Sequence, residues 1–199
     1  MSLTKQAKTL TKPQQKMVFT WIGQKRNGLR NQIMFLLSFK AGLRAKEISV
    51  LKWSDVTDSD GLIGNSIRIT NEMSKGNSGG RQIAMNKELQ MHLIGMFKEQ
   101  TEKRGFDLND RVIQSERKKV VASVVIANTF KDWFKECGFI GCSSHSGRRT
   151  FITEAARKVS TVGGSLRDIQ YLAGHSSIQT TQKYIETNED CHRQLINLI

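Results

Sequence analysis

The sequence has one proline, three cysteines and no run of about 18 apolar residues, the length a transmembrane helix requires. We therefore expect no membrane span, and the first residues also lack the apolar core of a secretory signal. The cysteines (Cys137, Cys142, Cys191) contain no CxxC pair, which favours reduced thiols in a cytoplasmic protein over a disulfide framework or a zinc site. The single proline, Pro13, leaves the chain free to form much helix.

Acidic residues are absent from the first 46 positions, which hold ten of the 31 lysines and arginines. The remaining 153 residues carry 21 basic and 18 acidic side chains, so most of the net charge of +13 lies in the N-terminal part. Phosphate backbones attract such an uneven basic surface, and this kind of binding weakens steeply as salt rises. We therefore expect a nucleic acid as partner; the alternative is a soluble protein with a positive surface.

The apolar spacing predicts a mainly helical chain with a small antiparallel sheet inserted early. Helices are expected where apolar residues recur every three or four positions. The segments that qualify are 13–22, 33–39, 45–51, 86–97, 123–137, the stretch after His145, 166–172 and 178–185. Alternating residues predict strands at 66–70 and 81–85, joined by the glycine-rich loop 74–80, with a third strand near 60–63.

Four motifs follow one another in a defined order. They are AGLRAKEI at 41–48, a lysine at a hairpin turn (Lys75), HSGRRTF at 145–151, and LAGHSS at 172–177 followed by TTQKY at 180–184. Together they resemble the tyrosine recombinases of the phage-integrase family over roughly residues 28–187. The resemblance implies the catalytic-domain fold of that family, mainly α with a small antiparallel sheet of three strands.

The resemblance implies a catalytic set of six residues: Arg44, Lys75, His145, Arg148, His175 and Tyr184. Arginine offers paired donors that match phosphate oxygens, and it stays charged at any working pH. A tyrosine has an ordinary pKa of about 10, so as nucleophile it needs these cations and a nearby base, for which His145 is the candidate. Lysine titrates and can protonate the leaving 5′-oxygen. The implied product is a 3′-phosphotyrosyl link, formed and resealed without metal, ATP or another cofactor.

Several other residues have two interpretations. Glu47 is either the carboxylate that supports the arginine in this family or a surface partner one helical turn from Arg44. Arg81 and the basic run that follows residue 116 either contact DNA phosphates or are solvated; the run is Arg117, Lys118 and Lys119. Tyr171 precedes Gly174 within a predicted helix, and we expect it to have a packing role.

The expected organisation is a basic segment or linker at 1–27, a catalytic domain at 28–187 and a tail at 188–199. The tail either docks on a neighbouring subunit or packs on its own domain. Because family members usually carry a preceding DNA-clamping domain, the chain is either a fragment or a short member resembling fimbrial-switch invertases.

The implied partners are double-stranded DNA and further copies of the chain, as a tetramer in the nucleoid. The reaction would be that of an integrase, invertase or resolvase; the alternatives are a non-catalytic DNA-binding regulator and a type IB topoisomerase-like enzyme.

Overall fold

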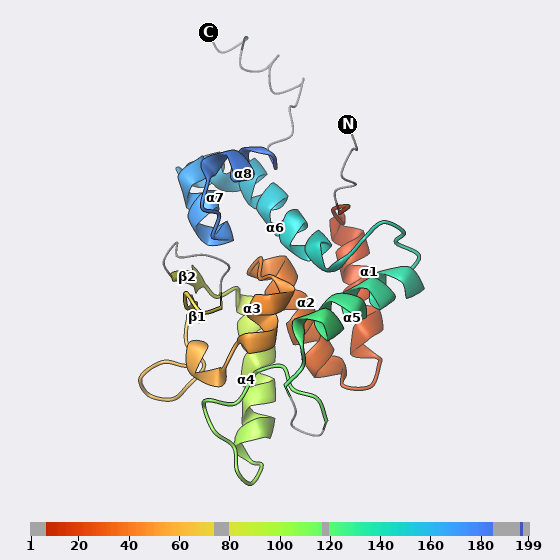
Figure 1. Ribbon diagram of the computed structural model, residues 1–199, viewed down its shortest axis with the longest axis vertical. Helices are drawn as coiled ribbons and strands as arrows, with labels where there is room; N and C mark the ends of the chain where they lie inside the picture. Colours follow the sequence, from red (N-terminus) through yellow and green to blue (C-terminus); the bar gives the residue numbers. More distant parts are fainter. Residues whose placement is uncertain (1–6, 74–79, 117–119, 185–195, 197–199) are drawn as a thin grey trace.

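The computed structural model describes residues 7–73, 80–116, 120–184 and 196. The α-helices, shown in Figure 1, are α1 Lys12–Gly23, α2 Gly28–Lys40, α3 Ala45–Val50, α4 Lys87–Thr101, α5 Ser123–Glu136, α6 Ser144–Lys158, α7 Leu166–Ala173 and α8 Ile178–Gln182. Two 3-10 helices and two strands complete the described elements: η1 Trp53–Asp55, η2 Val159–Val162, β1 Ser66–Ile69 and β2 Arg81–Ala84. Each helix that the apolar spacing predicts is present.

Residues at the helix ends account for two of these boundaries. The side-chain oxygen of Asn86 caps α4 by accepting a hydrogen bond from the Glu88 N–H at 3.0 Å. α7 ends at Ala173 and is capped by Gly174, whose φ of 59° is left-handed backbone that glycine adopts without strain. This turn sets the direction in which the chain leaves α7 toward His175.

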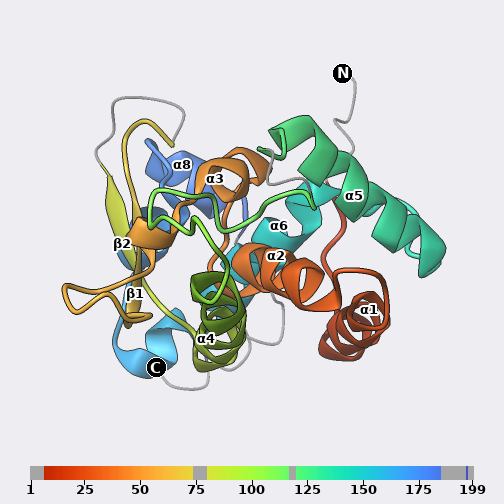
Figure 2. The same ribbon diagram turned by 90° about the horizontal axis from the view of Figure 1, so that it is seen from below.

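The basic N-terminal part packs into the same core as the elements that follow it. Val18 and Ile22 of α1 are fully buried, and α1 contacts both α2 and α5 (Figure 2). Before the helix, the Leu10 N–H donates to Thr150 Oγ1 on α6 at 3.0 Å. The division expected at residue 28 therefore has no counterpart in the packing, because the apolar face of α1 is covered by its neighbours while its charges face outward.

The sheet has two described strands rather than the three expected. β1 and β2 pair antiparallel with Ile67 opposite Ile83, and both of these side chains face the core. The segment near 60–63 forms only an isolated bridge, between Thr57 and Ile63. Asp58 prevents an extended strand there, because its side-chain oxygen accepts hydrogen bonds from the N–H groups of Asp60 and Leu62 and holds a turn.

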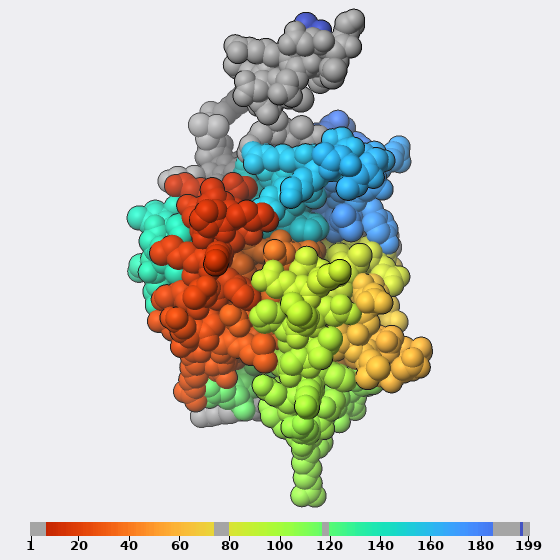
Figure 3. Space-filling view, turned by 180° about the vertical axis from the view of Figure 1, so that it is seen from behind, coloured from red at the N-terminus to blue at the C-terminus, as the bar shows by residue number. Residues whose placement is uncertain are grey.

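Buried apolar side chains form two clusters of unequal size. The larger extends from Leu10 to Phe134 and draws on α1 to α5 and both strands. The smaller is centred on Ile152, Ile169 and Ala173 of α6 and α7. Figures 1 and 3 show the C-terminal elements gathered at one end of the molecule, next to the body that the earlier elements build. The seam between the two clusters is where the functional side chains lie.

A glycine allows α6 to approach α2 closely at this seam. A Cβ on Gly147 would lie 2.2 Å from Ser38 Oγ and 2.7 Å from the ring of Phe39, so a side chain there has no space. The next residue along α6 is Arg148, whose Nη1 donates to the carbonyl of Gly42 just after α2, at 2.7 Å. The close crossing of the two helices therefore sets the depth at which this guanidinium lies.

Candidate active site

A cavity of about 570 Å³ opens at the seam between α3, α6 and the α7–α8 turn. Its lining includes five of the six residues that the motifs single out: Arg44, His145, Arg148, His175 and Tyr184. The sixth, Lys75, lies outside the described residues. Side chains more than a hundred positions apart in the sequence therefore meet around one space large enough to admit a phosphodiester.

Arg44 stands at the start of α3 and is held by Glu47. The Arg44 N–H donates to Glu47 Oε2 at 2.8 Å and its Nη1 donates to Oε1 at 3.1 Å. Glu47 has no exposed side-chain surface, whereas the Arg44 side chain is 29% exposed toward the cavity. Of the two interpretations of Glu47, the structure therefore favours the carboxylate that supports the arginine over the surface partner.

Arg148 is the deepest cation of the cavity. It is 5% exposed, and its Nη1 and Nη2 donate to the carbonyls of Gly42 and Ala173, on opposite sides of the seam. Burial, and then the positive charge of Arg44, lowers the pKa of Arg148 to about 9. The guanidinium remains cationic at neutral pH, in surroundings where its charge is weakly screened.

Three successive carbonyls at the end of α7 each accept a hydrogen bond from a different arginine. The pairs are Leu172 O with Arg81 Nε at 3.1 Å, Ala173 O with Arg148 Nη2, and Gly174 O with Arg44 Nη2 at 3.4 Å. The last carbonyls of a helix lack intrahelical partners and carry partial negative charge. The end of α7 therefore gathers three like charges and offsets part of their repulsion.

His175 follows this turn as a neutral imidazole. Burial, together with the charges of Arg148, Arg44 and Arg81, lowers the pKa of His175 to about 4. Its Nδ1 forms a hydrogen bond with Thr181 Oγ1 at 3.0 Å. One ring nitrogen is therefore engaged within the protein, and the imidazole can offer the other to a ligand in the cavity.

Tyr184 lies at the end of α8 against the smaller cluster. Its ring is half-buried and stacks on that of His175, with centroids 5.7 Å apart. Across the cavity, His145 is exposed in the first turn of α6, where its N–H donates to Ser143 Oγ. His145 and Arg148, three residues apart on α6, both line the cavity from one helix.

The structure corrects the expectation that Arg81 contacts DNA or solvent. Its side chain is 5% exposed and forms a two-pronged ion pair with Glu47, Nη1 to Oε1 at 3.0 Å and Nη2 to Oε2 at 3.1 Å. A signal was present in the sequence, because strand alternation puts Arg81 on the same face as the buried Ile83. The other expected DNA-contact residues, Arg117, Lys118 and Lys119, lie outside the described residues.

Three further residues at the site were not singled out for it from the sequence. Thr181 is fully buried and holds His175, and its place three residues before Tyr184 puts it on the adjoining helical turn. Arg149 and Lys183 also line the cavity and add positive charge to its rim. Each lies inside one of the motifs, close to a catalytic candidate, so this proximity in sequence is the available signal.

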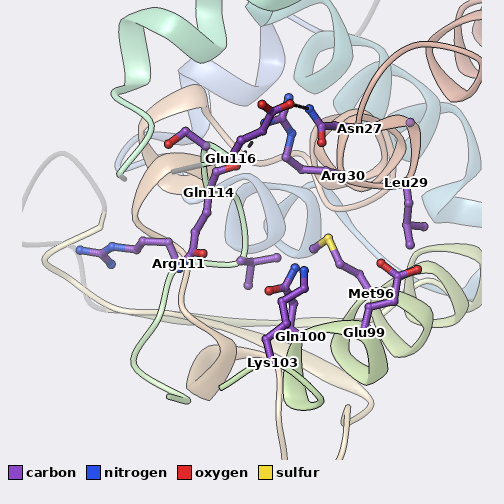
Figure 4. A pocket seen from close by; sticks show the side chains of 13 residues that line it. Asn27, Leu29, Arg30, Met96, Glu99, Gln100, Lys103, Arg111, Gln114 and Glu116 are labelled. Atoms are coloured by element: carbon purple, nitrogen blue, oxygen red, sulfur yellow. Dashed lines mark hydrogen bonds between the residues drawn. The ribbon is translucent and has the colours of Figure 1, made fainter. Parts of the chain in front are cut away.

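A second cavity, of about 430 Å³, contains none of the predicted site residues. It lies between the start of α2, the end of α4 and the segment before α5 (Figure 4). Two of its charged side chains are engaged with the protein: Arg30 Nη1 donates to the Gln114 carbonyl, and Glu116 accepts hydrogen bonds from Arg26 and Asn27. We therefore assign the chemistry to the seam cavity.

Other kinds of site find little support in the part of the chain that the structure describes. Within it, no three His, Cys, Asp or Glu side chains are grouped so that they could hold a metal ion. No helix there is both long and apolar enough to cross a bilayer. Cys137 and Cys142 are free thiols.

Sequence comparison places these residues in a wider context. The chain matches the model of the Phage integrase family over residues 6–190. It is 29% identical over 157 residues to tyrosine recombinase XerA of Thermococcus onnurineus, covering 78% of this chain and 50% of the relative. Against tyrosine recombinase XerC of Pelobacter propionicus it is 30% identical over 170 residues, covering 82% and 49%. The chain thus spans about half the length of the curated relatives it matches.

Comparison with solved structures concerns the fold. The crystal structure of XerA recombinase superposes with a TM-score of 0.72 at 22% identity, covering 100% of this chain and 65% of that one. XerH site-specific recombinase bound to its difH substrate gives 0.72 at 16% identity, covering 98% and 55%. The fold class expected from the motifs is confirmed.

Proposed function

This chain belongs to the phage integrase family, and from that premise we propose that it is a tyrosine recombinase that cuts and rejoins DNA through a 3′-phosphotyrosyl intermediate. The observation that carries the proposal is the seam cavity, where Arg44, Arg148 and His175 surround the space beside Tyr184. A site for DNA binding alone has no use for a tyrosine placed among phosphate-binding cations.

Stabilisation of charge is the first task of such a site. In the transition state the attacked phosphorus has five oxygen neighbours, and its non-bridging oxygens gather negative charge. Arg44 and Arg148 would bind these oxygens, with His175 as a further donor. Removing one preorganised donor of this kind typically costs about 3 kcal/mol of barrier, or 10²–10³ in rate.

Proton transfer is the second task. The phenol oxygen of Tyr184 attacks phosphorus, the bond from phosphorus to the 5′-oxygen breaks, and the phenol proton passes to a base. His145 is the candidate for this base, because it is exposed at the rim of the cavity and an imidazole can accept a proton. We assign the proton that the 5′-oxygen receives to Lys75. Rejoining is the same sequence in reverse, and the phosphotyrosyl bond conserves the energy of the phosphodiester.

Double-stranded DNA is the proposed partner, and the nucleoid the proposed site of action. Among proteins of similar fold, XerH was solved bound to difH, and the Tn1549 transposon integrase was solved with transposon right end DNA. The basic N-terminal part of this chain supports the same class of ligand. Assembly as a tetramer on DNA is the arrangement we propose from the family resemblance.

Covalent trapping on nicked DNA tests the proposal. The probe is a pool of duplexes with randomised centres and nicks, incubated in EDTA, so that the released 5′-hydroxyl fragment diffuses away and the adduct accumulates. We expect a denaturant-stable adduct with the wild type and also with Tyr171→Phe, which removes the chain's other tyrosine hydroxyl. The second adduct should form more slowly, because the hydrogen bond from the Gln82 N–H is lost. Tyr184→Phe should bind the pool with unchanged affinity and form no adduct.

Each alternative gives a different result in this assay. An adduct that persists in Tyr184→Phe shows that the nucleophile is wrongly assigned. Wild-type protein that binds the pool without ever forming an adduct is a DNA-binding regulator. An adduct accompanied by relaxation of supercoiled plasmid, with no joining of one duplex to another, identifies a topoisomerase-like enzyme.

A further inference from the structure

Arg81 lies outside the cavity but touches two of the elements that build it. It is the first residue of β2, its guanidinium binds Glu47 next to Arg44, and its Nε donates to the Leu172 carbonyl near the end of α7. We propose that Arg81 is a positioning residue that sets both the charge and the placement of the phosphate-binding groups. The proposal deepens the proposed function and rests on it.

The first argument concerns charge. Glu47 accepts four hydrogen bonds, two from Arg81 and two from Arg44, which match the lone-pair sites of a carboxylate. One carboxylate between two guanidinium groups leaves one positive charge in excess. Arg81 is the inner partner at 5% exposure and Arg44 the outer one at 29%. Arg81 therefore neutralises Glu47 and leaves the charge of Arg44 available to a phosphate.

Without Arg81 the charge balance between Glu47 and its arginine partners would change. Glu47 is fully buried, so its carboxylate must be compensated by whichever cation can reach it. Arg44 is the one that remains beside it, and the Arg44–Glu47 pair would be neutral as a whole. The guanidinium of Arg44 would turn inward, and the attraction of the cavity for a phosphate would decrease.

The second argument concerns placement. Two neighbouring residues of β2 bind the last turn of α7: Arg81 Nε donates to Leu172 O, and the Gln82 N–H donates to the Tyr171 hydroxyl, both at 3.1 Å. A Cβ on Gly174 would lie 2.7 Å from Arg81 Nη1, so the guanidinium occupies the space beside this turn. Figure 1 shows α7 next to β2. Because His175 follows the turn directly, its position depends on the same contacts.

A double-mutant cycle on adduct formation tests this role. Arg81→Met should slow single-turnover adduct formation about 10²-fold, and Arg44→Ala about 10²–10³-fold, the range for loss of one preorganised donor. Because Arg81 acts partly through Arg44, the slowing in the double variant should be about tenfold smaller than the product of the two single slowings. Arg68→Met, an exposed arginine of β1, is the matched control and should stay within about threefold of the wild type.

A second variant and a second readout keep the test decisive if folding suffers or cleavage is absent. Arg81→Lys retains the charge, loses the two-pronged geometry and should slow adduct formation about tenfold. Binding of inorganic phosphate, followed by NMR at His175 in Tyr184→Phe protein, needs no cleavage. Arg81→Met should weaken it about tenfold in this background, because Arg44 is drawn to Glu47.

The outcomes separate the two proposals. The positioning role is wrong if the slowing of adduct formation in the double variant equals the product of the two single slowings. It is also wrong if Arg81→Met leaves phosphate binding unchanged. In either case the recombinase proposal stands. If the wild type forms no adduct, the recombinase proposal fails. Phosphate binding alone then decides whether Arg81 keeps the charge of Arg44 available to a phosphate.

Discussion

The imidazole of His175 and the phenol ring of Tyr184 lie nearly parallel, with their centroids 5.7 Å apart and 23° between their planes. Thr181 joins them a second way, because its hydroxyl bonds to His175 Nδ1 and its carbonyl accepts the Tyr184 N–H at 3.0 Å. The proposed nucleophile and its neighbouring donor are therefore placed by one short helix, α8, and a displacement of that helix moves both.

Thr181→Val tests this connection. Valine keeps the shape of the buried side chain and removes the hydroxyl that orients His175, so we expect DNA binding to persist and adduct formation to slow about tenfold. Thr181→Ser keeps the hydroxyl and is the matched control, expected to stay near the wild-type rate. Equal rates for the valine and serine variants would contradict the connection.

Stability should depend on pH through His175. Its pKa is about 6.5 in an unfolded chain and about 4 in this fold. Between these values the unfolded chain binds the proton and the folded one does not, so the free energy of unfolding falls as pH decreases from 6.5 toward 4. The ring is only half-buried, so solvent screening limits the loss to about 1–2 kcal/mol. Urea unfolding at pH 7 and pH 5 measures it, and His175→Gln should lose less stability than the wild type.

Gly147→Ala should separate α6 from α2. Overpacking against Ser38 and Phe39 is expected to cost about 1–3 kcal/mol, and adduct formation should slow because Arg148 follows directly. Gly95→Ala on α4 is the control, since nothing lies within 4 Å of its added Cβ. That variant should stabilise the protein by about 0.5–1 kcal/mol in the same denaturation experiment. A stable, fully active Gly147→Ala would show that the close crossing is not needed.

α1 should behave as part of the folded unit. Ile22→Ala removes a fully buried side chain and is expected to cost about 2–5 kcal/mol in free energy of unfolding. Met17→Ala, on the exposed face of the same helix at 55% exposure, should change it by less than about 0.5 kcal/mol. Similar small losses for both variants would instead fit the linker expected from the charge distribution.

The helices follow from local apolar spacing, and the catalytic candidates that line the cavity follow from the four motifs and their family resemblance. Arg44, Arg148, His175 and Tyr184 stand in motifs whose spacing is unusual enough to be read together, and the structure places all four around one space. The end of α7 was readable from Gly174 for a similar reason, since a left-handed residue is a local requirement.

What the sequence did not reveal depends on tertiary contacts. Arg81 looked like a surface cation because arginine is rarely buried, and only the fully buried Glu47 explains its position. The N-terminal basic charges suggested a linker, although Val18 and Ile22 already formed an apolar stripe that needed cover. In both cases the charge favours an exposed position, whereas the periodicity of the neighbouring apolar residues favours burial.

The contact between α7 and the main body depends largely on hydrogen bonds, and this affects how firmly the two sides are held together. Arg44 stands on the main body, whereas His175 and Tyr184 follow α7 and α8 at the C-terminal end. Guanidinium-to-carbonyl bonds help to join the two sides. Breaking such hydrogen bonds costs less free energy than separating closely packed apolar side chains. A phosphate bound from both sides would add a further contact across this interface, so the DNA of the proposed reaction would itself stabilise the arrangement of the groups that act on it.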